Sequence, residues 1–233
     1  MFIFLSAGCP ADLAAQSETT PVNIPIAYLT QHTKTLPPLS LADQPTENNG
    51  LWGARLGIED NNTTGKFTGQ NFVLSEAVVA EDGDIAATFR DLYGKGNRFF
   101  VIDLPEKQLL TVADLPEAKD ALLFNIHAKD DSLRNDQCRA NVLHTIPDYA
   151  MLADGLAQYL IWKRWASWLL VTGTGEDDKH FADALRHAAE KFSATIVEER
   201  VFDAETGSRR TDTGHAQIQK QMPVFTQDAE DYD

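Results

Sequence analysis

GLWGARLGIEDNNTTGKFTGQ, residues 50–70, is the stretch that decides the fold. Its apolar residues recur at helical spacing, as in an amphipathic helix packed on a sheet. We expect Asn49 to cap the start of this helix and Gly65 to end it in the left-handed conformation. A strand then follows, and the same alternation of strand and helix recurs along the chain. The predicted apolar face consists of Leu51, Ala54 and Ile58, widened by Trp52 and Leu56.

Seven short apolar segments are predicted strands, and most are continuous apolar runs, which favours strands covered on both faces. They are Asn23–Leu29, Phe72–Ala80, Phe99–Asp103, Ala121–Ile126, Asn141–Ile146, Ser167–Thr172 and Thr195–Phe202. Helices with one apolar face fall between most of them. This order predicts an α/β protein with right-handed crossovers and a mainly parallel sheet.

Three of these helices have defined bounds: Asp84–Lys95, Pro147–Arg164 and Asp178–Phe192. Each has a predicted inward face. These faces are Ile85, Phe89 and Leu92 in the first helix, Leu152, Leu156, Tyr159 and Leu160 in the second, and Phe181, Leu185, Ala188 and Phe192 in the third.

The alternation of predicted strands and helices is interrupted between residues 125 and 146. Residues 127–137 are too polar for a helix with a core face and are predicted to form an exposed loop. We place a domain boundary near Thr145–Asp148. The chain then divides into a leader and polar start (1–21), a first domain (22–146) and a second domain (147–233). Residues 217–226 are weakly helical in pattern.

Composition excludes several classes of partner. The chain has 233 residues, of which 43% are hydrophobic and 24% charged, as in globular proteins. Its formal net charge of −15 argues against nucleic acid or an anionic membrane surface as partner. It contains no apolar run of 18 residues, so the sequence predicts no membrane span.

The N-terminus and the two cysteines bear on localisation. Met1–Leu5, followed by small residues, is similar to the end of an export signal, which predicts a periplasmic protein with an incomplete signal peptide. Leu5–Cys9 is a weak lipoprotein box, so a lipid anchor at Cys9 stays open. Cys138 is expected to be a buried small apolar side chain, with a disulfide to a residue outside this chain as the alternative. There is no Cys-x-x-Cys pair.

Several motifs, weak singly, stand in a specific order. They are Gly50-x-x-Gly53-Ala54, Ile58-Glu59-Asp60, Asn62, Gly65 and Gly69, then Asp82-Gly83-Asp84, then His144-Thr145-x-Pro147. Over residues 22–233 this order resembles the type I periplasmic solute-binding proteins of ABC transporters, in the branched-chain amino-acid-binding group. Residue 66 is a departure, since lysine stands where the family often has glycine. Residues 139–147 and 151–160 resemble a narrower branch that accompanies pyrroloquinoline-quinone (PQQ)-dependent alcohol oxidation.

The resemblance implies two α/β lobes that close on a small polar ligand and deliver it to an ABC permease complex. It implies binding rather than catalysis, without a cofactor, a metal or catalytic residues. Because family members are usually much longer, the chain is expected to be a fragment with an incomplete second lobe.

Ligands of open parallel sheets lie beyond the carboxyl ends of the strands. The predicted strand ends there are residues 30–32, 103–104, 125–128 and 173–178. The candidate ligand contacts are Asp103, Leu104, Asn125, His127, Ala128, Gly175 and Asp177, together with Tyr149 from the first turn after the boundary.

Asp103 and His127 depart from the family. The resemblance implies hydroxyls and backbone amides near these two positions, where they hold the carboxylate and ammonium of an amino acid. The departure favours a cationic or polyhydroxylated ligand, or a metal ion, over an α-amino acid. Two alternatives stay open, namely that Asp103 caps the helix starting near Pro105, and that Tyr149 packs in the core or on the surface.

Two rival functions remain. Residues 169–178 begin like a dinucleotide-binding loop, which would fit a cytoplasmic dinucleotide-dependent enzyme. However, Asp178 replaces the third glycine, and three consecutive acids would repel a pyrophosphate. The second rival is a ligand-sensing domain of a signalling system. His180 and His187 could share a helix face, but they lack a third metal ligand, and the default is that they are solvated.

Overall fold

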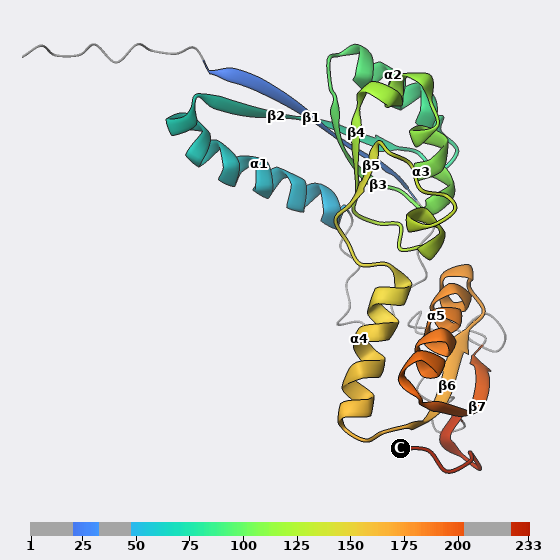
Figure 1. The fold of residues 1–233 in the computed structure, drawn as a ribbon. Coiled ribbons are helices and arrows are strands. Elements are labelled where there is room, and N and C mark those ends of the chain that lie inside the picture. Colours follow the sequence, from blue (N-terminus) through green and yellow to red (C-terminus); the bar gives the residue numbers. More distant parts are fainter. Residues whose placement is uncertain (1–20, 33–47, 203–224) are drawn as a thin grey trace, which may run out of the picture.

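The chain folds into two α/β lobes, one above the other in Figure 1. The structure is a computed structural model that describes residues 21–32, 48–202 and 225–233. The first lobe contains β1 (Val22–Gln31), α1 (Asn49–Thr68), β2 (Gln70–Val79), α2 (Ile85–Gly94), β3 (Phe99–Asp103), α3 (Glu106–Ala113), η1 (Pro116–Asp120), β4 (Leu122–Asn125), η2 (Asp131–Arg134) and β5 (Val142–His144). The second lobe contains α4 (Tyr149–Trp162), β6 (Ser167–Gly173), α5 (Glu176–Phe192) and β7 (Thr195–Phe202).

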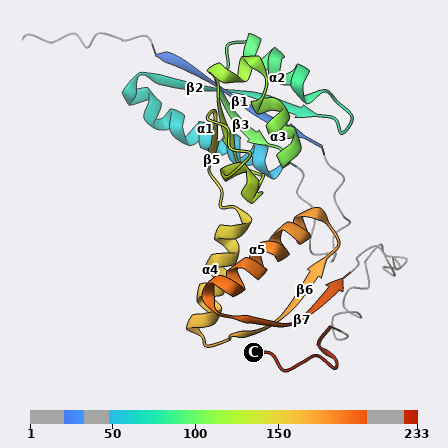
Figure 2. The ribbon, with the colours of Figure 1, turned by 45° about the vertical axis from the view of Figure 1, so that its right-hand side comes forward.

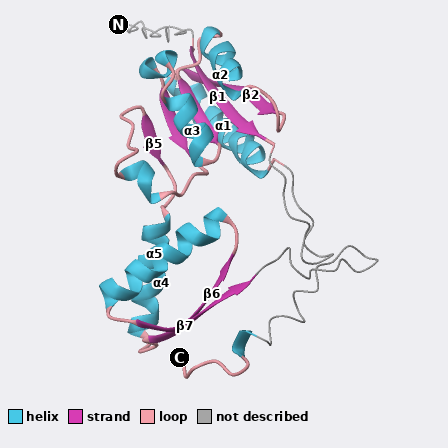
Figure 3. Cartoon of the chain, turned by 90° about the vertical axis from the view of Figure 1, so that its right-hand side faces the viewer, coloured by secondary structure: helices cyan, strands magenta, loops and turns pink. Residues whose placement is uncertain are grey.

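Both sheets are parallel throughout. Within the described residues, the first has five strands in the order β2-β1-β3-β4-β5, and the second pairs β6 with β7. Strands β3 and β7 have the predicted bounds, and the other five overlap their predicted segments. The predicted α/β class with a mainly parallel sheet is confirmed. The carboxyl ends of β1, β3 and β4 meet at one edge of the first sheet, which faces the second lobe (Figures 1 and 3).

The first lobe has its main core between the sheet and the pair of helices α2 and α3. Every apolar residue predicted for α2 is buried, and Asp84 caps that helix by accepting a hydrogen bond from the backbone N–H of Ala87 (2.9 Å). Neighbouring strand residues point to opposite faces. The fully buried residues of this core include Ala27, Leu29, Phe89, Phe100, Ile102, Leu109 and Leu123.

Helix α1 lies along β1 and β2 (Figure 2) and is held by polar side chains. Arg55 donates two hydrogen bonds of 2.6 Å to the carboxylate of Glu76 in β2. Asn62 donates from its amide to the carbonyl of Phe72 (2.9 Å) and accepts from the Phe72 N–H (2.7 Å). These contacts fasten the middle of the helix to the neighbouring strand.

Both predicted ends of α1 were wrong. Asn49 is the first helical residue; Asn48 precedes it with a left-handed backbone and no side-chain capping bond. The helix continues past Gly65 because Asn62 bonds to β2 instead of breaking the helix, and because Gly65 is buried against the backbone carbonyl of Gln70. Gly69, with φ of 68°, is the left-handed residue that ends it.

The predicted width of the α1 apolar face was also wrong. Leu51 is buried, but Trp52 and Leu56 are 59% and 60% exposed. The helix contacts the sheet along a narrow stripe, and the guanidinium of Arg55 lies over the outward Trp52 ring at 4.6 Å.

In the second lobe, α4 and α5 pack through small residues. The buried contact consists of Ala153 and Ala157 of α4 with Ala184 and Ala188 of α5. The predicted α4 face was therefore wrong: Leu152, Leu156 and Tyr159 are exposed, and Leu160 is half-buried. On α5, Ala188 is buried as predicted, and Phe181, Leu185 and Phe192 pack against the same cluster.

The polar segment 127–137 is more ordered than the predicted exposed loop. It contains the 3-10 turn η2, and its Leu133 is buried in the first core. Arg134 donates to the carbonyl of Ile146 (2.6 Å) and lies 3.4 Å from the carboxylate of Asp148. Asp148 caps α4 through the N–H of Met151 (2.8 Å). The segment thus supports the chain where it crosses from β5 to α4.

Some predictions meet a correction or fall outside the described residues. Cys138 is exposed, contrary to the predicted burial, and it forms no disulfide within the part of the chain that the structure describes. Among the residues that the structure describes, no helix has both the length and the apolar character to cross a membrane. The leader, Cys9 and most of the weakly helical segment at 217–226 lie outside the described residues.

Candidate functional site

A cleft of about 710 Å³ lies at the carboxyl edge of the first sheet and is lined by both lobes. Its first-lobe wall is formed by the start of α3 and the loop after β4, and its second-lobe wall by the starts of α4 and α5. The lining residues are Pro105, Glu106, Lys107, Gln108, Ile126, His127, Ala128, Lys129, Asp130, Tyr149, Glu176, Asp177 and His180.

Below the first-lobe wall, three side chains form a hydrogen-bonded chain. The hydroxyl of Tyr28, in the middle of β1, donates to Oδ2 of Asp103 at 2.5 Å. Oδ1 of Asp103 lies 2.8 Å from Nδ1 of His127. Tyr28 is fully buried, whereas the His127 side chain is 49% exposed and reaches the cleft. Buried strand and cleft surface are thus connected through Asp103.

The chemistry of Asp103 follows from these bonds. Burial by itself would raise the pKa of this carboxyl, but the hydrogen bonds from His127 and Tyr28 outweigh burial and lower the pKa. Burial, together with the bond to Asp103 and its charge, raises the pKa of the Tyr28 hydroxyl. An ionised Asp103 therefore accepts from a neutral phenol and from the imidazole. Asp103 does not cap α3: Pro105 occupies the N-cap position of this helix, and no side chain makes a capping hydrogen bond there.

Gly50 makes this arrangement sterically possible. It lies in the first turn of α1, against Tyr28 and Asp103. A Cβ at this position would lie 2.6 Å from Oδ2 of Asp103 and closer still to the Tyr28 hydroxyl. Only glycine lets the start of α1 approach so closely.

Asn125 shapes the loop that presents His127. Its side-chain oxygen accepts from the N–H groups of His127 (3.1 Å) and Ala128 (2.9 Å), and its amide donates to the Ala128 carbonyl (2.7 Å). Asn125 is fully buried, so its polar atoms are occupied within the protein. The turn after β4 is therefore fixed by one side chain.

The second-lobe wall is linked to the first across the cleft. Nδ1 of His180, in α5, lies 2.8 Å from Oδ1 of Asp130, in the loop after β4. The Tyr149 N–H donates to the carbonyl of Lys129 (2.9 Å). The Tyr149 ring packs against Phe181, with centroids 5.8 Å apart, so this side chain is half-buried beside the cleft.

Negative charge gathers around these residues. Burial and the charge of Glu106 raise the pKa of Asp130, although His180 opposes the shift. Burial, followed by the charges of Asp177 and Asp130, raises the pKa of Tyr149 to about 12. Glu176 pairs with Lys179 at 2.7 Å. The cleft interior is thus acidic.

The structure gathers some of the predicted ligand contacts and not others. His127, Ala128, Tyr149 and Asp177 line the cleft. Asp103 is not among the lining residues, but its carboxylate contacts the imidazole of His127. The predicted contacts without a place in the cleft lining are Leu104 and Asn125, both fully buried, and Gly175, which precedes α5. The role of all eight predicted residues as ligand contacts stays a prediction.

Four residues of the site were missed from the sequence: Tyr28, Glu106, Asp130 and His180. Tyr28 is a polar aromatic residue within an apolar strand, a signal that a buried hydroxyl needs a partner. Asp130 follows the predicted loop 125–128 by two residues. His180 was interpreted as solvated, yet it pairs with Asp130. Its partner belongs to the other lobe, and no sequence spacing reveals such a pair.

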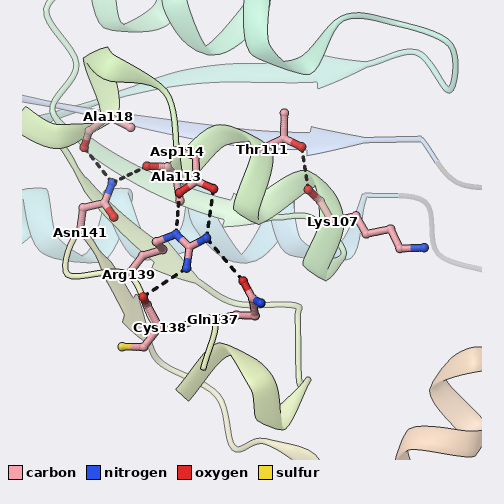
Figure 4. A network of polar contacts seen from close by, with 9 residues as sticks. All are labelled: Lys107, Thr111, Ala113, Asp114, Ala118, Gln137, Cys138, Arg139 and Asn141. Atoms are coloured by element: carbon pink, nitrogen blue, oxygen red, sulfur yellow. Dashed lines mark hydrogen bonds and ion pairs between the residues drawn. The ribbon is translucent and has the colours of Figure 1, made fainter. Parts of the chain in front are cut away.

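A second hollow, of about 380 Å³, lies at the opposite edge of the first sheet, around Arg139 and Asn141. Figure 4 shows the polar contacts of these two residues. Arg139 donates to both carboxylate oxygens of Asp114, at 2.5 and 3.1 Å. The Asn141 amide donates to the carbonyls of Ala113 (3.1 Å) and Ala118 (3.0 Å). Because its polar groups already have partners, this hollow is the weaker candidate. Within the described residues, no group of three or more His, Cys, Asp or Glu side chains could hold a metal ion.

Comparison with known proteins gives the family. A sequence model described as periplasmic binding protein matches residues 36–219. No protein among those of curated function matches the chain.

Solved structures share the fold. A branched-chain amino acid ABC transporter periplasmic ligand-binding protein of Burkholderia xenovorans matches with a TM-score of 0.65 at 18% identity, covering 89% of this chain and 59% of that one. The branched-chain amino acid transporter substrate-binding protein of Streptococcus pneumoniae, in complex with isoleucine, matches with a TM-score of 0.60 at 15% identity, covering 91% and 56%.

A third match is the leucine-, isoleucine-, valine-, threonine- and alanine-binding protein of Brucella ovis in its closed conformation, with a TM-score of 0.57 at 13% identity, covering 89% and 52%. The chain thus spans between half and three-fifths of the length of these structures. The family model covers well over half of the chain, so the chain belongs to the periplasmic binding protein family and has its type I fold.

Proposed function

We propose that this chain is an extracytoplasmic solute-binding protein that captures a small polar ligand between its lobes for an ABC transporter. The observation that carries the proposal is the cleft lined by both lobes at the carboxyl ends of the strands. One solved structure of the same fold is named as the periplasmic ligand-binding protein of an ABC transporter, and another, named as a transporter substrate-binding protein, holds isoleucine.

The proposed mechanism is binding coupled to a population shift between open and closed forms. The lobes are divided near residues 146 and 147, where η2 and Arg134 support the crossover to α4. His127 and Asp130 approach the ligand from the first lobe, and Tyr149 and Asp177 from the second. Delivery to a permease complex and a periplasmic location belong to the same proposal.

A link to PQQ-dependent alcohol oxidation is a finer part of the proposal. It is supported by the resemblance of residues 139–147 and 151–160 to that branch. The rival dinucleotide-binding function gains no support, because Glu176, Asp177 and Asp178 form the first turn of α5 and Asp178 accepts from the N–H of Gly175 (3.2 Å). Acids occupy the place where a pyrophosphate would bind.

The test is a thermal-shift screen of the whole chain against amino acids, alcohols, aldehydes, amines, metal ions and nicotinamide nucleotides. A true ligand at 100 times its dissociation constant stabilises the fold by about 2.7 kcal/mol. A rise in melting temperature with a small polar compound, lost when Tyr149 or Asp177 is changed to Ala, supports the proposal. A rise with nicotinamide nucleotides alone contradicts it.

A further inference from the structure

The inference rests on the proposed function and concerns the chemical class of the ligand. We propose that the cleft binds a small organic cation, an amine with several N–H donors, rather than an α-amino acid. Two features of the cleft favour an amine, namely the hydrogen-bonding state of His127 and His180 and the distribution of charge.

The contact with Asp103 determines the tautomer of His127. Asp103 is ionised and can only accept hydrogen bonds, so the Nδ1 of His127, 2.8 Å from Oδ1, carries the proton. In the neutral imidazole the Nε2 atom is then a bare acceptor. This histidine lines the cleft, and half of its side chain is exposed. It offers a ligand a lone pair.

His180 repeats the pattern from the second lobe. Its Nδ1 lies 2.8 Å from Oδ1 of Asp130, and its side chain is 44% exposed in the same cleft. A carboxylate acceptor again leaves Nε2 of the neutral ring as an acceptor. Each wall of the cleft thus contains an imidazole whose Nε2, in the neutral ring, is an acceptor.

The inner part of the cleft also carries negative charge. Glu106 and Asp130 are both half-buried in the cleft wall, and their mutual repulsion contributes to the raised pKa of Asp130. Asp177 adds a third carboxylate beside Tyr149. The two lysines of the lining, Lys107 and Lys129, are exposed, so their ammonium groups keep the solvation that the inner carboxylates lose.

An amino acid fits this cleft poorly. Its carboxylate would meet the half-buried carboxylates of Glu106 and Asp130, whereas the cationic side chains of the lining, Lys107 and Lys129, are exposed. An ammonium group instead relieves the repulsion between Glu106 and Asp130 and donates to His127 or His180. The acids at 176–178 also suit the N-terminus of α5, and Glu106 suits the N-terminus of α3, which accounts for their presence there but not for Asp130.

The test uses the whole chain and two matched pairs of compounds. Putrescine is compared with 1,4-butanediol, and ethanolamine with ethylene glycol, by calorimetric titration and thermal shift at pH 8. Leucine and zinc chloride complete the set. We expect the amines to bind and raise the melting temperature, whereas the uncharged analogues leave it unchanged.

Substitutions of single carboxylates test which residues bind the amine. Asp130→Asn and Glu106→Gln should each weaken amine binding by at least about tenfold, since each removes a charged partner of the ammonium. Glu106→Gln keeps the Asp130–His180 pair, so it remains informative if Asp130→Asn fails to fold. Asp114→Asn, whose carboxylate pairs with Arg139 at the opposite edge of the sheet, is the control and should leave the affinity unchanged.

The outcomes separate the inference from the function on which it rests. Binding of leucine without binding of either amine overturns the inference and keeps the proposed function. Stabilisation by zinc alone also overturns it, in favour of a metal ligand. Equal binding of diamine and diol overturns the role of charge. Absence of amine binding overturns the inference, and the fate of the proposed function is then decided by the wider screen.

Discussion

The Tyr28 hydroxyl donates a 2.5 Å hydrogen bond to Asp103, a residue 75 positions further along the chain. The bond joins neighbouring strands β1 and β3 on the face of the sheet next to the start of α1. It lies behind His127, and it leaves no room for a side chain at residue 50. One buried phenol therefore connects the start of α1, the sheet and the cleft.

The first prediction concerns Gly50. Replacing it with Ala forces the new Cβ against Tyr28 and Asp103, and we expect a loss of about 1–3 kcal/mol in the free energy of unfolding. Gly53→Ala is the matched control, because nothing lies within 4 Å of a Cβ there. In the helix interior that change should stabilise by roughly 0.5–1 kcal/mol. Urea denaturation measures both; equal effects of the two substitutions would contradict the packing described at Gly50.

Adjacent asparagines of α1 should behave differently. Asn62→Ala removes both hydrogen bonds to Phe72 and leaves backbone groups of β2 unpaired, so we expect about 1–3 kcal/mol of destabilisation. Asn61 donates only to the Gly57 carbonyl of its own helix (2.7 Å). Asn61→Ala should change the free energy of unfolding by less than about 0.5 kcal/mol. A larger loss from Asn61→Ala than from Asn62→Ala would show that α1 docks differently.

The lowered pKa of Asp103 predicts a pH dependence. Because the folded protein holds this carboxyl ionised more strongly than the unfolded chain does, Asp103 contributes stability above the ordinary Asp pKa of about 4. That contribution is lost as the pH falls through the lowered folded pKa. The difference in stability between the wild type and Asp103→Asn should therefore be largest near pH 6–7 and shrink below about pH 4. Urea midpoints from pH 3 to 7 measure it, and a difference that grows on acidification would reverse the assigned sign.

Cys138 should react as a free surface thiol. Its side chain is exposed and its sulfur points away from the network around Arg139 (Figure 4). In a Cys9→Ser background, a thiol reagent should modify one cysteine per folded chain without denaturant. If modification required urea, Cys138 would be buried in the folded protein, as predicted from the sequence.

The sequence predicted the strands well because each is a short apolar run bounded by polar turns. Prediction from the sequence failed where tertiary contacts determine the structure. Gly65 looked like a helix end, but its burial against β2 and the Asn62–Phe72 bonds carry the helix to Gly69. Helix α4 is apolar around most of its surface, so its pattern could not reveal that Ala153 and Ala157 face α5.

The candidate site was predicted in part for the same reason. Residues at strand ends, such as His127, follow from the topology of a parallel sheet. Partners from distant segments do not. The pairs Tyr28–Asp103 and Asp130–His180 connect residues separated by 75 and 50 positions, and only the folded chain brings them together.

The central claim is that two lobes close on a ligand in the cleft. It is tested most directly by a distance measurement between spin labels at Thr111→Cys in α3 and Glu190→Cys in α5, in a Cys9→Ser, Cys138→Ser background. With the compound of greatest thermal stabilisation at saturation, we predict that the distance distribution becomes shorter and narrower, and that Tyr149→Ala abolishes this change. A distribution that the bound compound leaves unaltered would contradict closure of the lobes on a ligand.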